Sequence, residues 1–182
     1  EKKEKVVRQL IREIENNKYR INTGFLSTPF ILQVLAENGH PEIAFRLLEQ
    51  TESPGWLRSV MLGSTTILEH WDGMELHRAS FNHYSFGAVC DFLFGTVAGI
   101  RPLFKAPGYK EFELKPVIGG TLTHAEAIYE SLYGTIISGW EIIGDKLRYY
   151  CSVPVNTTAH LILPNGDEHV LGSGKYEYLI NM

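Results

Sequence analysis

The spacing of hydrophobic residues changes once along the chain, near Ala106, and this change constrains the fold more than any other feature. Before it, apolar residues recur at the spacing of amphipathic helices. After it, apolar and polar residues alternate, as in strands with one buried face. The sequence therefore predicts an α+β protein with a helical domain over residues 1–105 and a domain of antiparallel strands over residues 106–182.

The helical part contains five predicted helices, over residues 4–16, 27–39, 40–51, 64–69 and 84–97. Ser27 precedes Thr28 and Pro29, an order typical of an N-cap followed by proline in the first turn. Gly39 ends the same helix. The last helix is apolar and is predicted to be largely buried, with Cys90 as an apolar filler rather than a nucleophile.

Seven strands are predicted in the second part, over residues 109–115, 121–130, 134–143, 146–153, 158–163, 168–171 and 176–180. Gly144-Asp145 and Asn165-Gly166 are typical of tight hairpin turns. Short strands separated by such turns favour an antiparallel β-sandwich, and Trp140 is expected in its core.

Composition and charge exclude several classes of partner. The net charge of −4 leaves no basic surface for a run of phosphates, so no nucleic acid is expected. No apolar run approaches 18 residues, and no signal-peptide core follows the charged residues 1–5, so no membrane segment is expected. The absence of an initiator Met before Glu1 indicates a longer precursor.

Neither a disulfide framework nor a metal site is indicated by the sequence. Cys90 and Cys151 are the two cysteines, and neither has a metal-ligand spacing. His124, His160 and His169 stand alone in the strand region. We therefore expect no metal and no cofactor.

Glu69, His70, Trp71 and Asp72 place two carboxylates beside an indole, just before Gly73. Aromatic rings beside carboxylates suit a sugar, because the ring stacks on C–H groups while the acidic oxygens accept from hydroxyls or activate water. The alternative is a helix C-terminus with a buried Trp71 and solvated carboxylates, and composition alone leaves both interpretations open.

A second polar cluster, residues 80–87, begins the last predicted helix, with Asn82 or Ser80 as its cap. His83 could extend into a cleft as a hydrogen-bonding or acid–base group, or it could merely cap and pack. Trp56 follows the Ser53-Pro54-Gly55 turn, and its side chain could line a cleft or lie in the core.

Several motifs in order give the chain a family resemblance. Thr23-Gly24-Phe25, the Thr-Thr-x-x-Glu-x-Trp-Asp-Gly stretch over 65–73, and residues 80–84 resemble the bacterial α-L-rhamnosidases of the inverting (α/α)6-barrel type. The match continues through Ala98 to Pro102, Pro107 to Lys110, Ser131 to Gly134, and Trp140. It covers residues 20–182, and it implies the last helices of an incomplete toroid followed by the C-terminal β-sandwich.

The resemblance also implies roles for individual residues. Glu69 matches the general base that activates the hydrolytic water. His83 and Trp71 match residues of the sugar pocket, and Asp72 is expected among the substrate-binding residues. Leu68 stands where the family usually has tryptophan, and this difference bears on the fine specificity.

An inverting glycosidase needs a second carboxyl group, about 6.5 to 9.5 Å from the base. Asp72 follows Glu69 by three residues, which on a helix separates the Cβ atoms by only about 5 to 6 Å. Nothing in residues 1–62 resembles the family's acidic motif. We therefore expect a fragment that carries the base, lacks the upstream acid and is inactive alone.

The expected substrate of the parent enzyme is a terminal α-L-rhamnosyl residue of a glycoside or polysaccharide. Two alternatives remain open at this point. One is a different (α/α)6-barrel glycosidase or lyase, and the other is a non-catalytic carbohydrate-binding or structural module.

Five helices offer too many apolar positions to bury mutually. Exposed apolar surface usually marks an interface, so a homodimer through the helical region is expected. The positions concerned are Leu10, Ile11, Val34, Leu35, Leu47 and Leu48.

Overall fold

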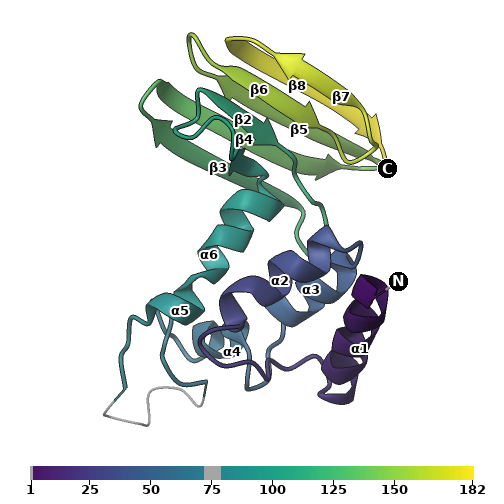
Figure 1. Cartoon of the computed structure of the whole chain (residues 1–182), viewed down its shortest axis with the longest axis vertical. Coiled ribbons are helices and arrows are strands. Elements are labelled where there is room, and N and C mark those ends of the chain that lie inside the picture. The colour runs from purple at the N-terminus through teal and green to yellow at the C-terminus, as the bar shows by residue number, and fades with distance from the viewer. Residues whose placement is uncertain (1, 72–78) are drawn as a thin grey trace. The chain divides into compact units, whose positions relative to one another are not determined.

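The computed structural model describes residues 2–71 and 79–182 of the chain (Figure 1). Close contacts between Cα atoms divide the chain into two compact units, residues 1–90 and residues 91–182. The predicted domain boundary near Ala106 stays a prediction. Among the described residues, no helix is both long and apolar enough to cross a bilayer.

The first unit is helical, and its helices are α1 (Lys2–Asn16), α2 (Thr28–Glu37), α3 (Pro41–Leu48), α4 (Trp56–Met61) and α5 (Tyr84–Gly87). The predicted helices at 4–16, 27–39 and 40–51 are thus confirmed as α1, α2 and α3. Figure 1 shows α2 and α3 packed as a pair. The apolar core of the unit includes Ile31, Leu32, Leu35, Ala44, Phe45, Leu47, Trp56 and Phe86.

The helix predicted over residues 64–69 is wrong. The structure has α4 upstream of it, and this helix ends before Gly63, whose φ of +85° favours glycine. The Ser64 side chain then donates to the Thr66 carbonyl at 2.6 Å, which competes with helical backbone bonding. The segment after Gly63 therefore runs as an irregular chain.

The helix predicted over residues 84–97 is present but interrupted, as α5, α6 (Val89–Phe92) and the π-helical turn η1 (Leu93–Val97). It is also less buried than predicted, because Tyr84 is 86% exposed. Cys90 is exposed, so its assignment as a buried filler is wrong, whereas Cys151 is buried.

The prediction of an exposed apolar surface on the helices is wrong for two of its residues. Leu35 and Leu47 are fully buried, because α2 and α3 cover each other. Val34 on α2 is exposed, as predicted, and Phe30 on the same helix is exposed in addition. The homodimer itself stays a prediction.

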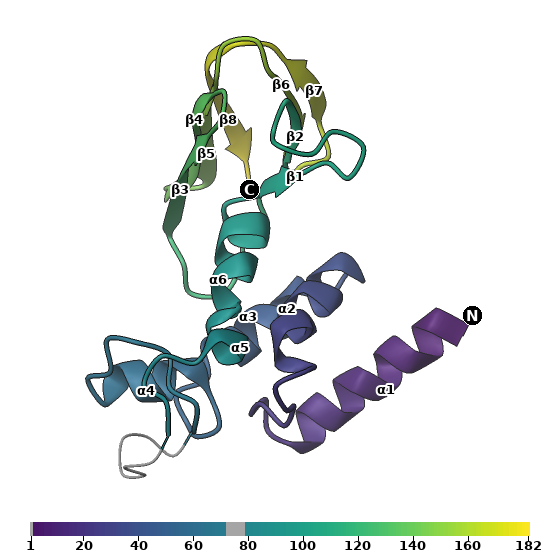
Figure 2. The same cartoon turned by 60° about the vertical axis from the view of Figure 1, so that its left-hand side comes forward.

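The second unit is a sandwich of two four-stranded sheets, which face each other in Figure 2. One sheet has the order β1-β2-β6-β7 and the other the order β3-β4-β5-β8. The bounds are β1 (Ile100–Pro102), β2 (Glu111–Leu114), β3 (His124–Ser131), β4 (Gly134–Ile143), β5 (Lys146–Val153), β6 (Thr158–Ile162), β7 (Glu168–Leu171) and β8 (Gly174–Asn181).

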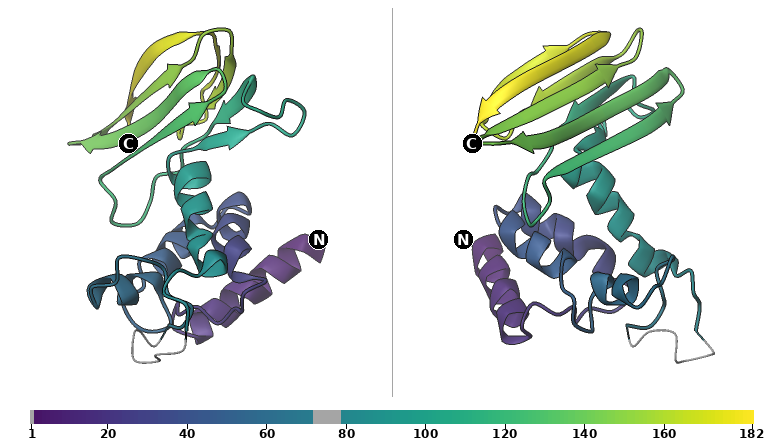
Figure 3. Two further views of the ribbon diagram at one scale, coloured as in Figure 1. Left: turned by 90° about the vertical axis from the view of Figure 1, so that its left-hand side faces the viewer. Right: turned by 180° about the vertical axis from the view of Figure 1, so that it is seen from behind.

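All seven predicted strands are present, with β1 as an additional short one. The expected purely antiparallel pairing fails at one place, because β2 pairs with β6 in parallel, from Glu111 beside Thr158 to Leu114 beside Leu161. The reason is the path of the chain, which leaves β2, builds the antiparallel strands of the other sheet and then returns (Figure 3). Parallel strands need such a long crossover.

Trp140 lies in the sandwich core, as predicted, and is fully buried. Its indole N–H donates to the Val97 carbonyl at 2.8 Å. Ser138 donates to the Ala98 carbonyl at 2.6 Å and lies 3.0 Å from the Tyr149 hydroxyl, which therefore donates to it. Side chains of the sheet thus satisfy the carbonyl groups that the last helical turn leaves without partners.

Gly99 connects η1 to β1 in a conformation that requires glycine. Its φ is +84°, and a Cβ atom there would lie 2.3 Å from the Pro116 nitrogen. The Lys115 N–H donates to the Gly99 carbonyl at 2.9 Å, so the two segments touch along their backbones. This contact explains the glycine in the Ala98 to Pro102 motif.

The two cysteines are expected to differ sharply in reactivity. Burial raises the pKa of the Cys151 thiol to about 11, so at pH 8 only about one molecule in a thousand carries a Cys151 thiolate. Cys90 is exposed. We expect Ellman's reagent to titrate one thiol quickly in the folded chain and the second only after unfolding.

The Cys90→Ser variant is the control for this experiment, because it removes the exposed thiol alone. It should abolish the fast phase. A fast phase that persists in this variant would contradict the burial of Cys151.

Candidate functional site

The candidate site is built where two irregular segments of the first unit pair along their backbones. The Glu69 N–H donates to the Ser80 carbonyl at 3.0 Å, and the His83 N–H donates to the Ile67 carbonyl at 2.8 Å. The Thr66 hydroxyl donates to the Phe81 carbonyl between them. These bonds hold Glu69 and His83, 14 positions apart in sequence, on neighbouring stretches of chain.

The Glu69 carboxylate is half-buried and held in place. Its Oε2 atom accepts from the Ser80 N–H at 2.7 Å. Because the Glu69 N–H also bonds Ser80, both ends of the glutamate are fixed to one residue. A charge-assisted bond of this length restricts the rotamer of the carboxylate. The Leu68 side chain beside it is buried, at 5% exposure.

Phe86 lies at the centre of an aromatic cluster next to this carboxylate segment. Its ring stacks on Trp71 with centroids 4.2 Å apart, and it meets His83 and Phe25 edge-on at 5.1 and 5.3 Å. The Trp56 indole donates to the Phe86 carbonyl at 3.0 Å. The cluster thus joins α4, α5 and the segments on either side of them.

His83 is itself the N-cap of α5, so the prediction of Asn82 or Ser80 as the cap is wrong. The His83 Nδ1 atom lies 3.5 Å from the Phe86 N–H, which donates to it. In the neutral imidazole the proton then resides on Nε2. The ring also lies 4.6 Å from that of Phe25. The structure thus confirms the capping interpretation of His83, whereas its extension into a cleft stays a prediction.

Trp71 is half-buried, with one face of its indole stacked on Phe86. Its carbonyl accepts from the Ser53 hydroxyl at 3.0 Å, and its ring meets Trp56 at an interplanar angle of 88°. Asp72, the remaining candidate, lies outside the described residues. Trp56 is 4% exposed, which places it in the core.

Two residues that sequence reasoning did not single out support the site. Ser85 is buried, and its hydroxyl donates to the Phe25 carbonyl. Phe86 organises the aromatic cluster. Both lie in the polar cluster of residues 80–87, but the local sequence does not distinguish them from the exposed Tyr84.

Thr28 connects the Thr23-Gly24-Phe25 motif to α2. Its buried hydroxyl lies 3.0 Å from the Thr23 carbonyl and 2.9 Å from the Gly24 carbonyl, and its single proton can be donated to either. The Thr23 hydroxyl lies 2.8 Å away. The motif is therefore a compact turn that presents Phe25 to His83.

Residues of these types suit a polar ligand with an apolar face. A fixed carboxylate can accept a proton or a hydroxyl hydrogen bond, an imidazole can donate, and an aromatic ring can pack on C–H groups. Within residues 2–71 and 79–182, no three His, Cys, Asp or Glu side chains gather as metal ligands.

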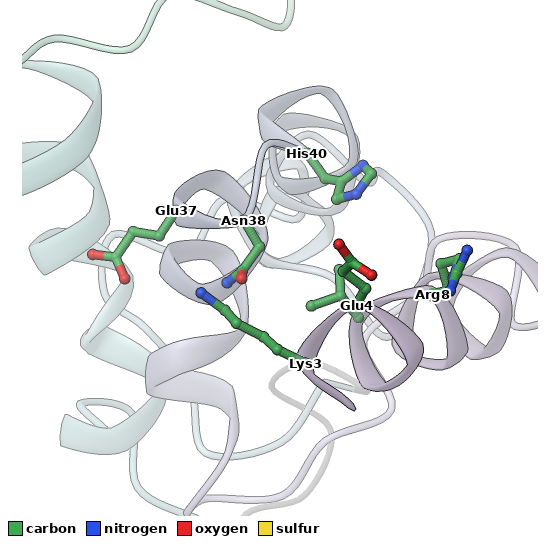
Figure 4. Close-up of a pocket in the computed structure, with 7 residues that line it drawn as sticks. Lys3, Glu4, Arg8, Glu37, Asn38 and His40 are labelled. Carbon is green, nitrogen blue, oxygen red and sulfur yellow. The ribbon is translucent and has the colours of Figure 1, made fainter. Parts of the chain in front are cut away.

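A hollow of the first unit lies elsewhere, between α1 and the turn from α2 to α3. It has a volume of about 640 Å³ and is lined by Lys3, Glu4, Val7, Arg8, Glu37, Asn38 and His40. In Figure 4 the Glu4 and His40 side chains face one another across it. None of Glu69, Trp71 and His83 lines this hollow, so it does not form part of the candidate site.

Two family profiles define the class of protein. Residues 1–97 match the family profile of the bacterial α-L-rhamnosidase 6 hairpin glycosidase domain, and residues 99–177 match that of the bacterial α-L-rhamnosidase C-terminal domain. The chain therefore belongs to the bacterial α-L-rhamnosidase family of glycoside hydrolases.

Relatives of known sequence and structure agree with this assignment. An α-L-rhamnosidase of Streptomyces avermitilis is 37% identical over 163 residues, which is 86% of this chain and 16% of that protein. A crystal structure of an Aspergillus terreus α-L-rhamnosidase superposes with a TM-score of 0.89 at 32% identity, over 96% of this chain and 21% of the other.

A Streptomyces avermitilis α-L-rhamnosidase structure, complexed with L-rhamnose, gives a TM-score of 0.88 at 31% identity, over 96% of this chain and 19% of the other. The chain thus spans about a fifth of the length of these relatives.

Removal of the buried Ser85 hydroxyl is expected to destabilise the first unit. In Ser85→Ala the Phe25 carbonyl loses this donor, which should lower the free energy of unfolding by about 1 to 3 kcal/mol. Urea unfolding followed by circular dichroism measures this loss.

Ser27→Ala is the matched control, because Ser27 is exposed and its side chain makes no capping hydrogen bond. It should change the free energy of unfolding by less than about 0.5 kcal/mol. Equal effects of the two substitutions would contradict the role of Ser85.

Proposed function

We propose that this chain supplies the general base and part of the sugar pocket of an enzyme that hydrolyses terminal α-L-rhamnosyl bonds with inversion. The observation that carries the proposal is the fixed Glu69 carboxylate, bonded at Oε2 to the Ser80 N–H beside the aromatic cluster. The family membership and the L-rhamnose bound to the Streptomyces avermitilis relative support rhamnose as the sugar.

Glu69 acts on water in the proposed reaction. The Ser80 N–H occupies Oε2, so Oε1 is the oxygen that takes the proton from the water. The water oxygen then bonds to the anomeric carbon, on the face opposite the leaving oxygen, as the glycosidic bond breaks. The configuration at the anomeric carbon is thereby inverted.

His83 and Trp71 bind and orient the sugar in this proposal, without transferring a proton. The His83 Nε2–H is free of the helix cap at Nδ1 and can donate to a sugar hydroxyl. Trp71 is held by its stacking on Phe86 and offers an aromatic surface to the methyl group and C–H bonds of a deoxy sugar. Asp72 is proposed as a further contact to substrate hydroxyls.

The leaving oxygen must be protonated by a second carboxylic acid, about 6.5 to 9.5 Å from the base. We propose that this acid lies outside the present chain, in keeping with relatives that are about five times longer. The chain alone then binds but does not hydrolyse rhamnosides, and a longer enzyme that includes it does both.

The Glu69→Gln substitution in such a longer enzyme tests the base directly. Glutamine keeps an oxygen for the Ser80 N–H but cannot take a proton. The rate of hydrolysis of an aryl α-L-rhamnoside should fall by about 10² to 10⁴. Proton NMR of the wild-type reaction should show the β anomer of L-rhamnose first.

Glu42→Gln on α3 is the matched control, and it should keep the wild-type rate. The proposal fails for Glu69 if its variant retains more than about a tenth of that rate. The isolated chain, assayed under the same conditions, should show no turnover.

The binding roles of His83 and Trp71 are tested with L-rhamnose as the ligand. We expect His83→Ala and Trp71→Ala in the longer enzyme each to weaken its binding by about 1 kcal/mol, because each removes one contact to the sugar. Isothermal titration calorimetry measures the effect.

His40→Ala is the control, since this histidine lies in the same unit but lines the separate hollow. A loss of less than about 0.5 kcal/mol in both of the site variants would assign His83 and Trp71 structural roles alone.

A further inference from the structure

We propose a second, non-catalytic binding site for a neutral glycan on the outward face of the β3-β4-β5-β8 sheet, centred on Tyr150. The site lies wholly within the second unit and shares no residue with the candidate catalytic site. It therefore goes beyond the proposed function, although the choice of rhamnose as one probe below depends on that function.

The strand register brings the residues of this site to one face. Glu126 on β3 pairs with Gly139 on β4, Gly139 pairs with Tyr150 on β5, and Tyr150 pairs with Glu177 on β8. Partners in register share a face of a sheet, so these four residues form one row. In the same way Ser152 pairs with Lys175 and forms part of the next row.

Gly139 makes room for the Tyr150 ring. A Cβ atom at position 139 would lie 2.4 Å from the Tyr150 Cζ atom, so the phenol rests directly on the glycine backbone. The Tyr150 hydroxyl donates to Glu126 Oε2 at 2.9 Å. A ring fixed at its base and at its tip is a preformed stacking surface, which loses little conformational entropy when a ligand binds.

The Arg148 guanidinium lies over this ring and brings a fixed set of hydrogen-bonding groups to it. Its Nη1 donates to Glu141 at 2.6 Å and its Nη2 to Glu177 at 2.7 Å, and the guanidinium carbon lies 5.3 Å from the Tyr150 ring centroid. The Arg148 guanidinium also lowers the pKa of the Glu177 carboxyl through the hydrogen bond between them. All three charged groups remain partly exposed, so they can still meet ligand hydroxyls.

The hollow beside the ring has the size of a small-ligand site. Its volume is about 330 Å³, at the lower end of the range of about 300 to 1,000 Å³ for such pockets. Its lining residues include Glu126, Arg148, Tyr150, Lys175 and Glu177. A hollow of this size fits a short glycan better than a folded segment of another protein.

The charges around the hollow select a neutral ligand. Two carboxylates, of Glu126 and Glu177, balance two cations, of Arg148 and Lys175. A phosphate or a uronate would meet the carboxylates, and a cationic ligand would meet Arg148 and Lys175. A sugar ring offers an apolar C–H face to Tyr150 and hydroxyls to the surrounding charges.

The test is a titration of the isotope-labelled chain, followed by the backbone amide signals of Gly139, Tyr150 and Lys175. The probes are L-rhamnose, the rhamnose-containing disaccharide rutinose, and cellobiose, with digalacturonate as a charged comparison. We expect saturable shifts of these amides with at least one neutral probe, and weaker binding of digalacturonate.

Two variants and one control assign the binding to Tyr150. Tyr150→Ala should weaken it by at least about tenfold. Gly139→Ala should do so too, because the new methyl group displaces a ring that is still present. Tyr133→Ala, at the exposed β3–β4 turn, removes a tyrosine outside the hollow and should leave the affinity within about twofold.

Three results would overturn the proposal. The first is that no neutral probe shifts these amides at tens of millimolar. The second is tighter binding of digalacturonate. The third is a set of shifts that depends on protein concentration but not on sugar, which would mark an interface between copies of the chain.

The two proposals are tested by different variants. Tyr150→Ala in a longer enzyme should leave the hydrolysis of a small aryl rhamnoside unchanged, whereas Glu69→Gln should slow it.

Discussion

Phe86 is the residue on which the arrangement of the aromatic cluster in the first unit depends. Its carbonyl binds the Trp56 indole, its N–H donates to the His83 ring, and its own ring stacks on Trp71. Aromatic side chains bury large areas and prefer defined ring geometries, so one such residue can orient several others. Phe86, which is only 3% exposed, thereby fixes the positions of His83 and Trp71, the residues proposed to bind the sugar.

The regular elements could be predicted from the sequence because their signals are local. The strands β4, β5 and β7 begin and end where alternation and the turn residues indicated. The α2–α3 pair follows from the prolines at the start of each helix. The resemblance to the family, likewise, rested on short motifs and is confirmed by the family profiles.

The site geometry could not be predicted in the same way, because it depends on contacts between distant residues. The sequence analysis predicts a short helix over residues 64–69, yet backbone groups of this segment bond to residues 80–83, and only the folded chain reveals that competition. Cys90 has apolar neighbours in sequence and is nevertheless exposed, because it lies on the solvent-facing side of α6. The roles of Glu69, His83, Trp71 and Asp72 remain proposals with defined experiments.

The parallel pair of β2 and β6 has a consequence for the order of folding. Glu111 lies beside Thr158, 47 positions later in the sequence, whereas β3, β4 and β5 connect through tight turns. Contacts between close neighbours in sequence form with a smaller loss of chain entropy than contacts across long loops. During synthesis on the ribosome, the β3–β5 meander can assemble first, and β2 must wait for β6 to emerge before its own sheet can close.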